Sequence, residues 1–183
     1  MYNKFFTLVL LIFFTLTLIS FAANKPKYVG ANKCKTCHKA EKNGQQYKIW
    51  SEKKHAQAYK HLTSDTAKKK AELMGVKDPL KDEKCLSCHS TAYGKKNVDK
   101  SFKVEDGVSC EACHGPGSLY KKIKVMKDKK ASMAVGLLEV NEATCKQCHK
   151  ADTPGHDGKF KDFKTEFAKI AHPIPPENDR RKK

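Results

Sequence analysis

Eight cysteines are the residues of this 183-residue sequence whose type and spacing most clearly indicate chemistry. They fall without remainder into four copies of Cys-x-x-Cys-His, so a histidine follows the second cysteine every time. A disulfide framework or paired zinc knuckles would use the cysteines but would not require that histidine. The four copies are Cys34-Lys-Thr-Cys37-His38, Cys85-Leu-Ser-Cys88-His89, Cys110-Glu-Ala-Cys113-His114 and Cys145-Lys-Gln-Cys148-His149.

Cys-x-x-Cys-His is the attachment signature of c-type haem, and the chemistry accounts for each position. The two thiols add across the two vinyl groups of the porphyrin, and a two-residue gap on a turn of helix spans their separation. The histidine that follows lies under the ring and binds the iron through its imidazole. The sequence therefore predicts four covalently bound haem c groups, whose proximal iron ligands are His38, His89, His114 and His149.

Four further histidines lie outside the motifs, one for the second axial position of each iron. We expect His55 and His172 to be distal ligands, because apolar residues surround both in the sequence. His61 is six residues from His55, about 240° around a continuous helix, so it could serve only a different haem. His156 lies in a turn, Thr153-Pro-Gly-His156-Asp-Gly, where a surface role fits equally well. His61 and His156 are possible distal ligands.

The composition of the chain supports a core built from cofactor. From Ala23 onward, Leu, Ile, Val and Phe make up 23 of 161 residues. This fraction lies below the roughly 20% at which a strongly charged chain is expected to be disordered unless something else supplies a core. A conventional enzyme with an aliphatic interior is thereby excluded. We predict a mainly α-helical, small multihaem cytochrome with little regular sheet and a core of four haems.

The first 22 residues read as a secretory signal peptide. Lys4 precedes the apolar run Leu8 to Ile19, and Ser20-Phe21-Ala22 supplies small residues for cleavage. An uncleaved anchor is the alternative, since about 18 apolar residues can span a bilayer. We expect cleavage, a periplasmic protein without stable membrane insertion, a tetrahaem domain over 23–176 and a basic flexible tail over 177–183. Removing Lys4 leaves 36 basic and 20 acidic residues, a formal charge of +16.

Short helices must position the motifs. Apolar residues at three- or four-residue steps predict helices over 47–62, 65–74, 119–136 and 160–170. Ser64, Ser109 and Asn141 are placed as N-caps, and Gly75 as a C-terminal stop. The motifs begin 51, 25 and 35 residues apart, which is too irregular for a solenoid repeat. The short second gap predicts that the second and third haems lie close together.

Residues that flank the motifs resemble the tetrahaem cytochrome c-554 family of nitrifying bacteria. They include Trp50 five residues before His55, and Tyr93-Gly94 after the second motif. The most specific stretch is Gly107-Val108-x-Cys110-Glu111-x-Cys113-His114-Gly115-Pro116-Gly117. The resemblance implies a helical periplasmic electron carrier with closely stacked haems that accepts electrons from hydroxylamine oxidation.

The resemblance also implies axial ligands. It matches His55 and His172 to distal positions, and it implies that the haem held by His89 is five-coordinate and can bind small molecules. The family's third distal histidine comes several residues after Gly-Pro-Gly, where this chain has Tyr120-Lys-Lys-Ile-Lys124. Either His61 or His156 takes that role, or one more haem is open.

Three functions compete on these observations. The first is electron transfer to or from redox partners, with the lysine-rich surface steering an acidic partner into place. The second is an enzyme that converts a small nitrogen or oxygen species at an open haem, although no acid–base pair is evident beside one. The third is a subunit of a larger conductive assembly in which a neighbour donates a ligand. An exported chain without a nucleic-acid motif excludes nucleic-acid binding.

Overall fold

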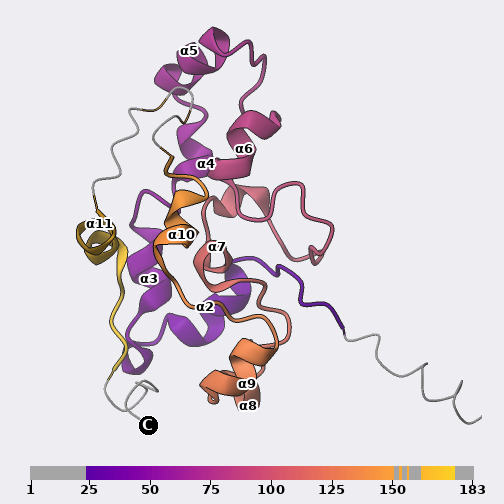
Figure 1. Ribbon diagram of the computed structural model, residues 1–183, viewed down its shortest axis with the longest axis vertical. Coiled ribbons are helices and arrows are strands. Elements are labelled where there is room, and N and C mark those ends of the chain that lie inside the picture. The colour runs from indigo at the N-terminus through magenta and orange to yellow at the C-terminus, as the bar shows by residue number, and fades with distance from the viewer. Residues whose placement is uncertain (1–23, 151–152, 154–155, 157–161, 176–183) are drawn as a thin grey trace, which may run out of the picture.

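A computed structural model describes residues 24–150, 153, 156 and 162–175, and those residues form short helices joined by turns (Figure 1). Within this described part no strand is formed, and one isolated parallel bridge joins Tyr28 to Val98. The predicted mainly helical fold class is confirmed. The helices are α2 (Asn32–His38), α3 (Gln46–Ser51), α4 (Ala58–His61), α5 (Asp65–Leu73), α6 (Glu83–His89), α7 (Cys110–His114), α8 (Ile123–Met126), α9 (Lys129–Ala134), α10 (Glu142–Lys146) and α11 (Phe163–Ile170), with 3-10 turns η1 (Glu41–Asn43) and η2 (Val104–Asp106).

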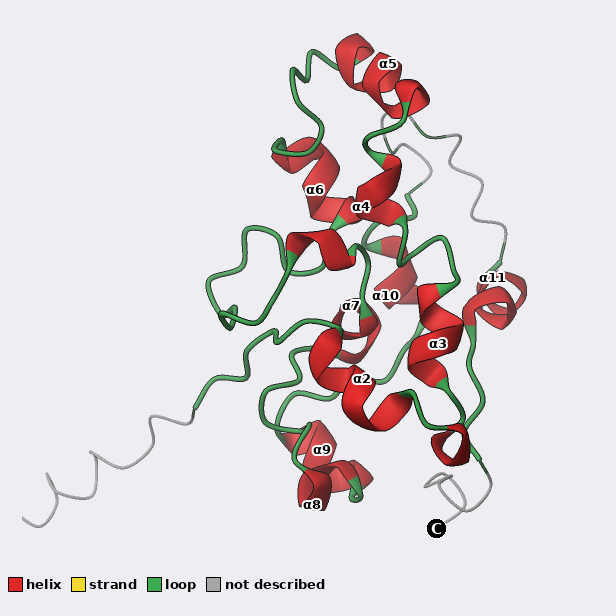
Figure 2. Ribbon diagram, turned by 180° about the vertical axis from the view of Figure 1, so that it is seen from behind, coloured by secondary structure: helices red, strands yellow, loops and turns green. Residues whose placement is uncertain are grey.

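The helices form an elongated arrangement. Helix α5 lies at one end, α8 and α9 lie at the other, and α2, α3, α7 and α10 lie between them (Figures 1 and 2). Helix α2 packs against α3, and α4 packs against both α6 and η2. The helices that carry the four motifs are therefore gathered in the middle of the molecule and beside α4.

Side-chain caps begin several of these helices, as the sequence predicts. The Ser64 hydroxyl accepts a hydrogen bond from the Ala67 N–H at 3.2 Å and starts α5. Asn141 and Thr144 form a reciprocal capping box at the start of α10. Ser109 occupies the N-cap position of α7, but its hydroxyl makes no capping bond. The predicted cap at Ser109 is therefore correct in position and wrong in its hydrogen bond.

The helix predicted over 47–62 is broken, so the expectation of a continuous helix at His55 is wrong. Helix α3 ends at Ser51, α4 begins at Ala58, and His55 lies in the turn between them. The His55 carbonyl accepts a hydrogen bond from Val108 N–H at 3.0 Å, while the Trp50 indole N–H donates to the Val108 carbonyl at 2.9 Å. These contacts with the segment before α7 replace the helical hydrogen bonds at this point.

The helix predicted over 119–136 is also broken, into α8 and α9. Asp128 causes the break, because its carboxylate accepts a hydrogen bond from Ala131 N–H at 2.9 Å and starts a new helix there. Ile123 and Met133 are 65% and 42% exposed, so these two residues of the predicted stripe lie largely on the surface. The helix predicted over 160–170 begins at Phe163 after the Asp162 cap, and its first residues lie outside the described part.

The buried apolar core of the described residues is small. It consists of seven side chains, and only two of them, Ala71 and Leu86, lie inside helices: the set is Val29, Ala31, Leu62, Ala71, Val76, Leu86 and Tyr120. This scarcity agrees with the composition, which provides too few large aliphatic side chains for an ordinary interior. Among the described helices, none has the length and apolar character needed to cross a bilayer.

Candidate haem-attachment sites

Each motif begins on or just inside a short helix, which presents its two cysteines on one turn. Helices α2, α6 and α7 each contain a whole motif, and α10 contains Cys145 and ends before Cys148 and His149. All eight cysteines are described, and all carry free thiols. The chain thus forms none of the disulfides of the alternative framework, and every thiol is in the form needed for a thioether bond.

The thiols pair between motifs, and this pairing divides the molecule into two halves. The Cys34 thiol of the first motif contacts the Cys110 thiol of the third, within hydrogen-bonding reach. In the same way Cys88 of the second motif contacts Cys148 of the fourth. We call the region of α2 and α7 the first–third half and the region of α6 and α10 the second–fourth half.

Hydrogen bonds also join the second and third motifs. The Thr91 hydroxyl, two residues after His89, accepts a hydrogen bond from Ser109 N–H at 2.7 Å, and Thr91 N–H donates to the Gly107 carbonyl at 2.9 Å. The end of α6 is thereby held against the start of α7. The backbone contact agrees with the closeness predicted from the short sequence gap, whereas the thiol pairs join other motifs.

Histidine rings lie opposite one another at a spacing that fits a shared metal ion. An imidazole nitrogen lies about 2 Å from a bound metal and its ring centre about 1 Å further, so two rings on one ion have centres about 6 Å apart. The ring centres are 6.0 Å apart for His55 and His149, and 5.9 Å apart for His114 and His172. Each pair joins a motif histidine to one of the two expected distal histidines.

The second motif has two histidine rings beside its own. The ring centre of His89 is 5.8 Å from that of His156 and 6.5 Å from that of His61. The two possible distal ligands of the sequence analysis therefore lie at the same motif. For His38, the motif histidine of α2, the structure records a side-chain hydrogen bond to Gln46 and no histidine ring contact.

Two motif histidines have one ring nitrogen fixed by the chain. The Nδ1 of His89 donates to the Ala58 carbonyl at 2.8 Å, and the Nδ1 of His38 donates to Oε1 of Gln46 at 3.2 Å. A carbonyl oxygen can only accept, so Nδ1 carries the proton and Nε2 keeps its lone pair for a metal. Neither contact was predicted from the sequence, because the tertiary fold brings Ala58 and Gln46 to these histidines.

The remaining imidazoles are held in the neutral form that binds iron. Burial, together with the neighbouring charges of His172 and His38, lowers the pKa of His114 to about 4. Burial also lowers the pKa of His55, His89 and His172. The Nδ1 of His172 is buried without a hydrogen-bond partner. A buried polar atom without a partner is rare in folded proteins, so the unpartnered nitrogen suggests that the ring of His172 is placed to bind a cofactor.

A buried carboxylate organises the first–third half. Glu111, inside the third motif, is 1% exposed and accepts hydrogen bonds from the N–H groups of Val29, Gly30 and Gly117 at 2.6 to 2.9 Å. We call these four residues the Glu111 cluster. Burial raises the pKa of the Glu111 carboxyl, and the three N–H groups act in the opposite direction. The family resemblance includes Glu111, but its role was not predicted, because its three N–H partners are brought to it by the tertiary fold.

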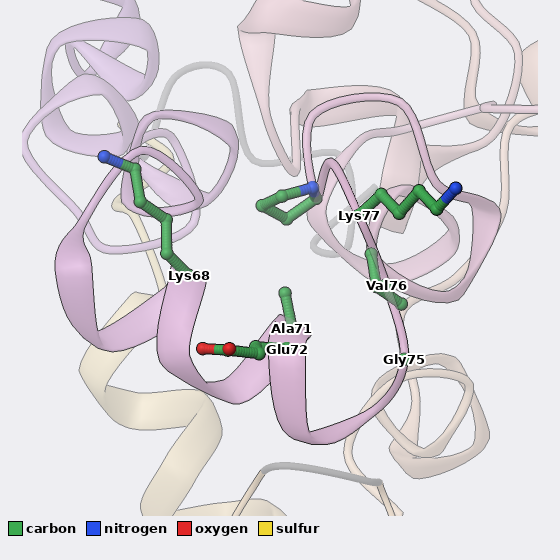
Figure 3. A pocket seen from close by; sticks show the side chains of 7 residues that line it. Lys68, Ala71, Glu72, Gly75, Val76 and Lys77 are labelled. Atoms are coloured by element: carbon green, nitrogen blue, oxygen red, sulfur yellow. The ribbon is translucent and has the colours of Figure 1, made fainter.

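The pocket of Figure 3 lies away from the motifs. It has a volume of about 560 Å³ and lies between α5 and the loop that follows it, where Lys68 and Lys77 extend on opposite sides of Ala71. No group of three or more His, Cys, Asp or Glu side chains in the described residues is arranged to hold a metal ion by itself. The candidate metal ligands of the chain are therefore the histidine pairs. Each pair would supply the two axial ligands of an iron whose other four ligands are porphyrin nitrogens.

Comparison with known proteins agrees with this geometry. Residues 33–115, which include the first three motifs, match the family model described as cytochrome c554 and c-prime. This segment is similar to the cytochrome c-554 family. The resemblance found in the sequence is thus confirmed, and the family implies covalently bound haem c. The fourth motif lies outside the matched segment.

Two proteins illustrate the relationship. Cytochrome c-554 of Nitrosomonas europaea is 37% identical over 115 residues, which cover 59% of this chain and 46% of that protein. The chain thus matches less than half the length of that relative. The solved structure of reduced cytochrome c554 from Nitrosomonas europaea aligns with a TM-score of 0.55 at 24% identity, and the alignment covers 87% of this chain and 79% of the other. The second match shows a shared fold.

Proposed function

We propose that this protein is a periplasmic electron carrier that holds four c-type haems. The observation that carries the proposal is the contact of motif thiols across the molecule, Cys34 with Cys110 and Cys88 with Cys148. Haem c supplies reversible one-electron chemistry at its iron when it is bound. Because the attachment points touch in pairs, groups linked to them lie edge to edge, which is the arrangement that electron tunnelling between cofactors needs.

The chain itself would supply attachment, axial ligands and insulation from water. The eight cysteines are the covalent links, His38, His89, His114 and His149 are the proximal ligands, and His55 and His172 are distal ligands for the fourth and third motifs. The burial of His114 and His172 holds both imidazoles neutral and their iron in a low-dielectric site. No acid–base pair is required for this role.

A positive surface would guide the protein to its partner. After removal of the leader, 34 of the 36 basic residues are lysines, and the formal charge is +16. Eight haem propionates would lower it to about +8, which still favours an acidic docking surface on the partner. By analogy with the family, the electron donor is an enzyme of hydroxylamine oxidation.

The test uses the haem-loaded protein secreted by a host that attaches haem c. Intact mass should exceed that of the chain from Ala23 by four haems, and a redox titration should show four one-electron steps. Electron exchange with an acidic redox partner should slow as ionic strength rises. A mass with fewer than four haems would exclude the tetrahaem assignment, and a rate independent of salt would exclude steering by charge.

A second candidate function is small-molecule binding or conversion at an open haem. One observation favours it, since His38 makes no recorded histidine ring contact. Turnover of hydroxylamine or nitric oxide by the purified protein would separate this candidate from simple electron transfer. A carrier should exchange electrons with its partner and leave both molecules unchanged.

A further inference from the structure

We propose that the haem of the second motif has two histidine ligands, His89 and His156, and that the haem of the first motif, held by His38, is the five-coordinate one. This inference rests on the proposed tetrahaem function. It reverses the expectation from the family resemblance, which places the open site on the haem of His89. It also assigns a role to the turn histidine for which the sequence allowed a surface position.

The spacing of the rings gives the first argument. The His89–His156 centres are 5.8 Å apart, within 0.2 Å of the 5.9 Å and 6.0 Å of His114–His172 and His55–His149. All three lie near the about 6 Å expected for two imidazoles on one metal ion. The ring centre of His61 is 6.5 Å from that of His89, so spacing alone does not decide between His61 and His156.

The hydrogen bond of His89 gives the second argument, because it favours His156 over His61 as the distal ligand. His89 Nδ1 donates to the carbonyl of Ala58, so the opposite edge of the ring, which carries Nε2, faces away from Ala58. Ala58 and His61 belong to the single turn of α4, and their backbones are about 4.5 Å apart along the helix axis. The metal-binding nitrogen of His89 is therefore directed away from the turn that carries His61.

His156 is free of this constraint because it belongs to a different part of the chain. It follows α10, beyond the fourth motif, and its charge also acts on the Cys88 thiol of the second motif. A residue that reaches the second motif from the chain after α10 can approach the haem from the face opposite α4. The contact of Cys88 with Cys148 places the start of this segment at the second motif.

With these assignments, no histidine remains as a distal ligand for the haem of the first motif. His55 pairs with His149, His172 pairs with His114, and His156 pairs with His89. All eight histidines of the chain are among the described residues, and His61 belongs to the turn of α4 that the Nδ1 of His89 contacts. The ring of His38 is held by Gln46 through Nδ1, which directs Nε2 toward an iron whose other axial position receives no histidine.

The number of carbon monoxide molecules bound per chain tests whether His156 is an axial ligand of a haem. After mass spectrometry has confirmed four haems, the reduced wild-type protein should bind one carbon monoxide per chain. His156→Ala should double that number to two, and the matched variant His61→Ala should leave it at one. A wild-type count other than one, a count of one in His156→Ala or a count of two in His61→Ala would overturn the inference. A mass with fewer than four haems would instead overturn the proposed function.

A second measurement locates the open haem without removing any ligand. Five-coordinate ferrous haem produces an iron–histidine stretching band in resonance Raman spectra, and the frequency of this band rises when Nδ1–H donates a stronger hydrogen bond. Gln46→Leu removes the acceptor of His38 and should lower the frequency of the band. Gln46→Glu should raise that frequency. Gln57→Leu, whose amide bonds to the Ser51 carbonyl, is the matched control and should leave the band unchanged. An unchanged band frequency in both Gln46 variants would show that the open haem is not that of His38.

Discussion

The two halves of the molecule use the same motif position in opposite ways. The residue after the first cysteine is Leu86 in the second motif and Glu111 in the third, and each is 1% exposed. Leu86 adds an apolar side chain to a small core, whereas Glu111 binds three backbone N–H groups. The first–third half is thus held together by a polar cluster of the chain. The described residues of the second–fourth half show no carboxylate that binds several backbone N–H groups in this way, so we expect this half to depend more on its cofactors.

Asp106 strengthens this contrast, since it adds a second carboxylate to the first–third half. Its Oδ2 accepts a hydrogen bond from Ala31 N–H at 3.0 Å, one residue beyond the cluster. Burial raises the pKa of Asp106, and the Ala31 N–H opposes that change. Two carboxylates from separate segments therefore fix the backbone of 29–31 directly before the first motif. The haem that we infer to be open lies in the half that the chain itself holds most firmly.

The largest expected effect comes from leaving the haems out. Chain expressed without haem attachment should lose its cooperative thermal transition, because seven buried apolar side chains in the described residues cannot offset the entropy of ordering. Any residual amide-exchange protection should be confined to Val29, Gly30 and Gly117 of the Glu111 cluster. A sharp transition in haem-free protein, or equal protection around α6, would remove the contrast between the halves.

Truncation of the two equivalent motif residues compares the halves directly. Glu111→Ala leaves three buried N–H groups without acceptors at about 1–3 kcal/mol each, so we expect a loss of about 3–9 kcal/mol. Leu86→Ala should cost about 2–4 kcal/mol through the cavity it leaves. Denaturant unfolding of the haem-loaded proteins measures both values. The exposed neighbour Glu105→Ala is the control and should stay within about 0.5 kcal/mol of wild type.

The junction between the halves can be broken at a glycine. Gly107 has φ +64°, and a Cβ there would lie 2.9 Å from the His55 carbonyl oxygen and 3.0 Å from that of Ala56. We expect Gly107→Ala to cost about 2–3 kcal/mol from backbone strain and crowding together, and to perturb the low-spin spectrum of the haem that His55 serves.

Gly75→Ala is the matched control for this change. Gly75 has φ +68°, but a Cβ there meets nothing within 4 Å, so strain alone should cost about 1–2 kcal/mol and leave the haem spectra unchanged. Equal losses in the two variants, with equal spectra, would show that the approach of Gly107 to His55 contributes nothing.

Local signals in the sequence predicted a large part of this structure. The motifs, the family and the caps at Ser64 and Asn141 follow from residue types at fixed spacing, which act over one helical turn. The continuous helix over 47–62 was wrong because Val108, far along the chain, competes for the His55 carbonyl. Glu111 and Gln46 were missed for the same reason, since their partners are fixed by the tertiary fold. The axial ligands of each haem remain predictions of the same kind.

The smallest expected effect compares the caps of the two motif helices that Asn141 and Ser109 begin. Asn141→Ala removes a formed capping box from α10 and should cost about 1 kcal/mol. The Ser109 hydroxyl makes no capping bond and is buried without a partner, so Ser109→Ala should be neutral or slightly stabilising. Thermal unfolding of the haem-loaded variants measures the difference. An equal loss at both positions would mean that Ser109 caps α7 after all, and that the halves begin their motif helices in the same way.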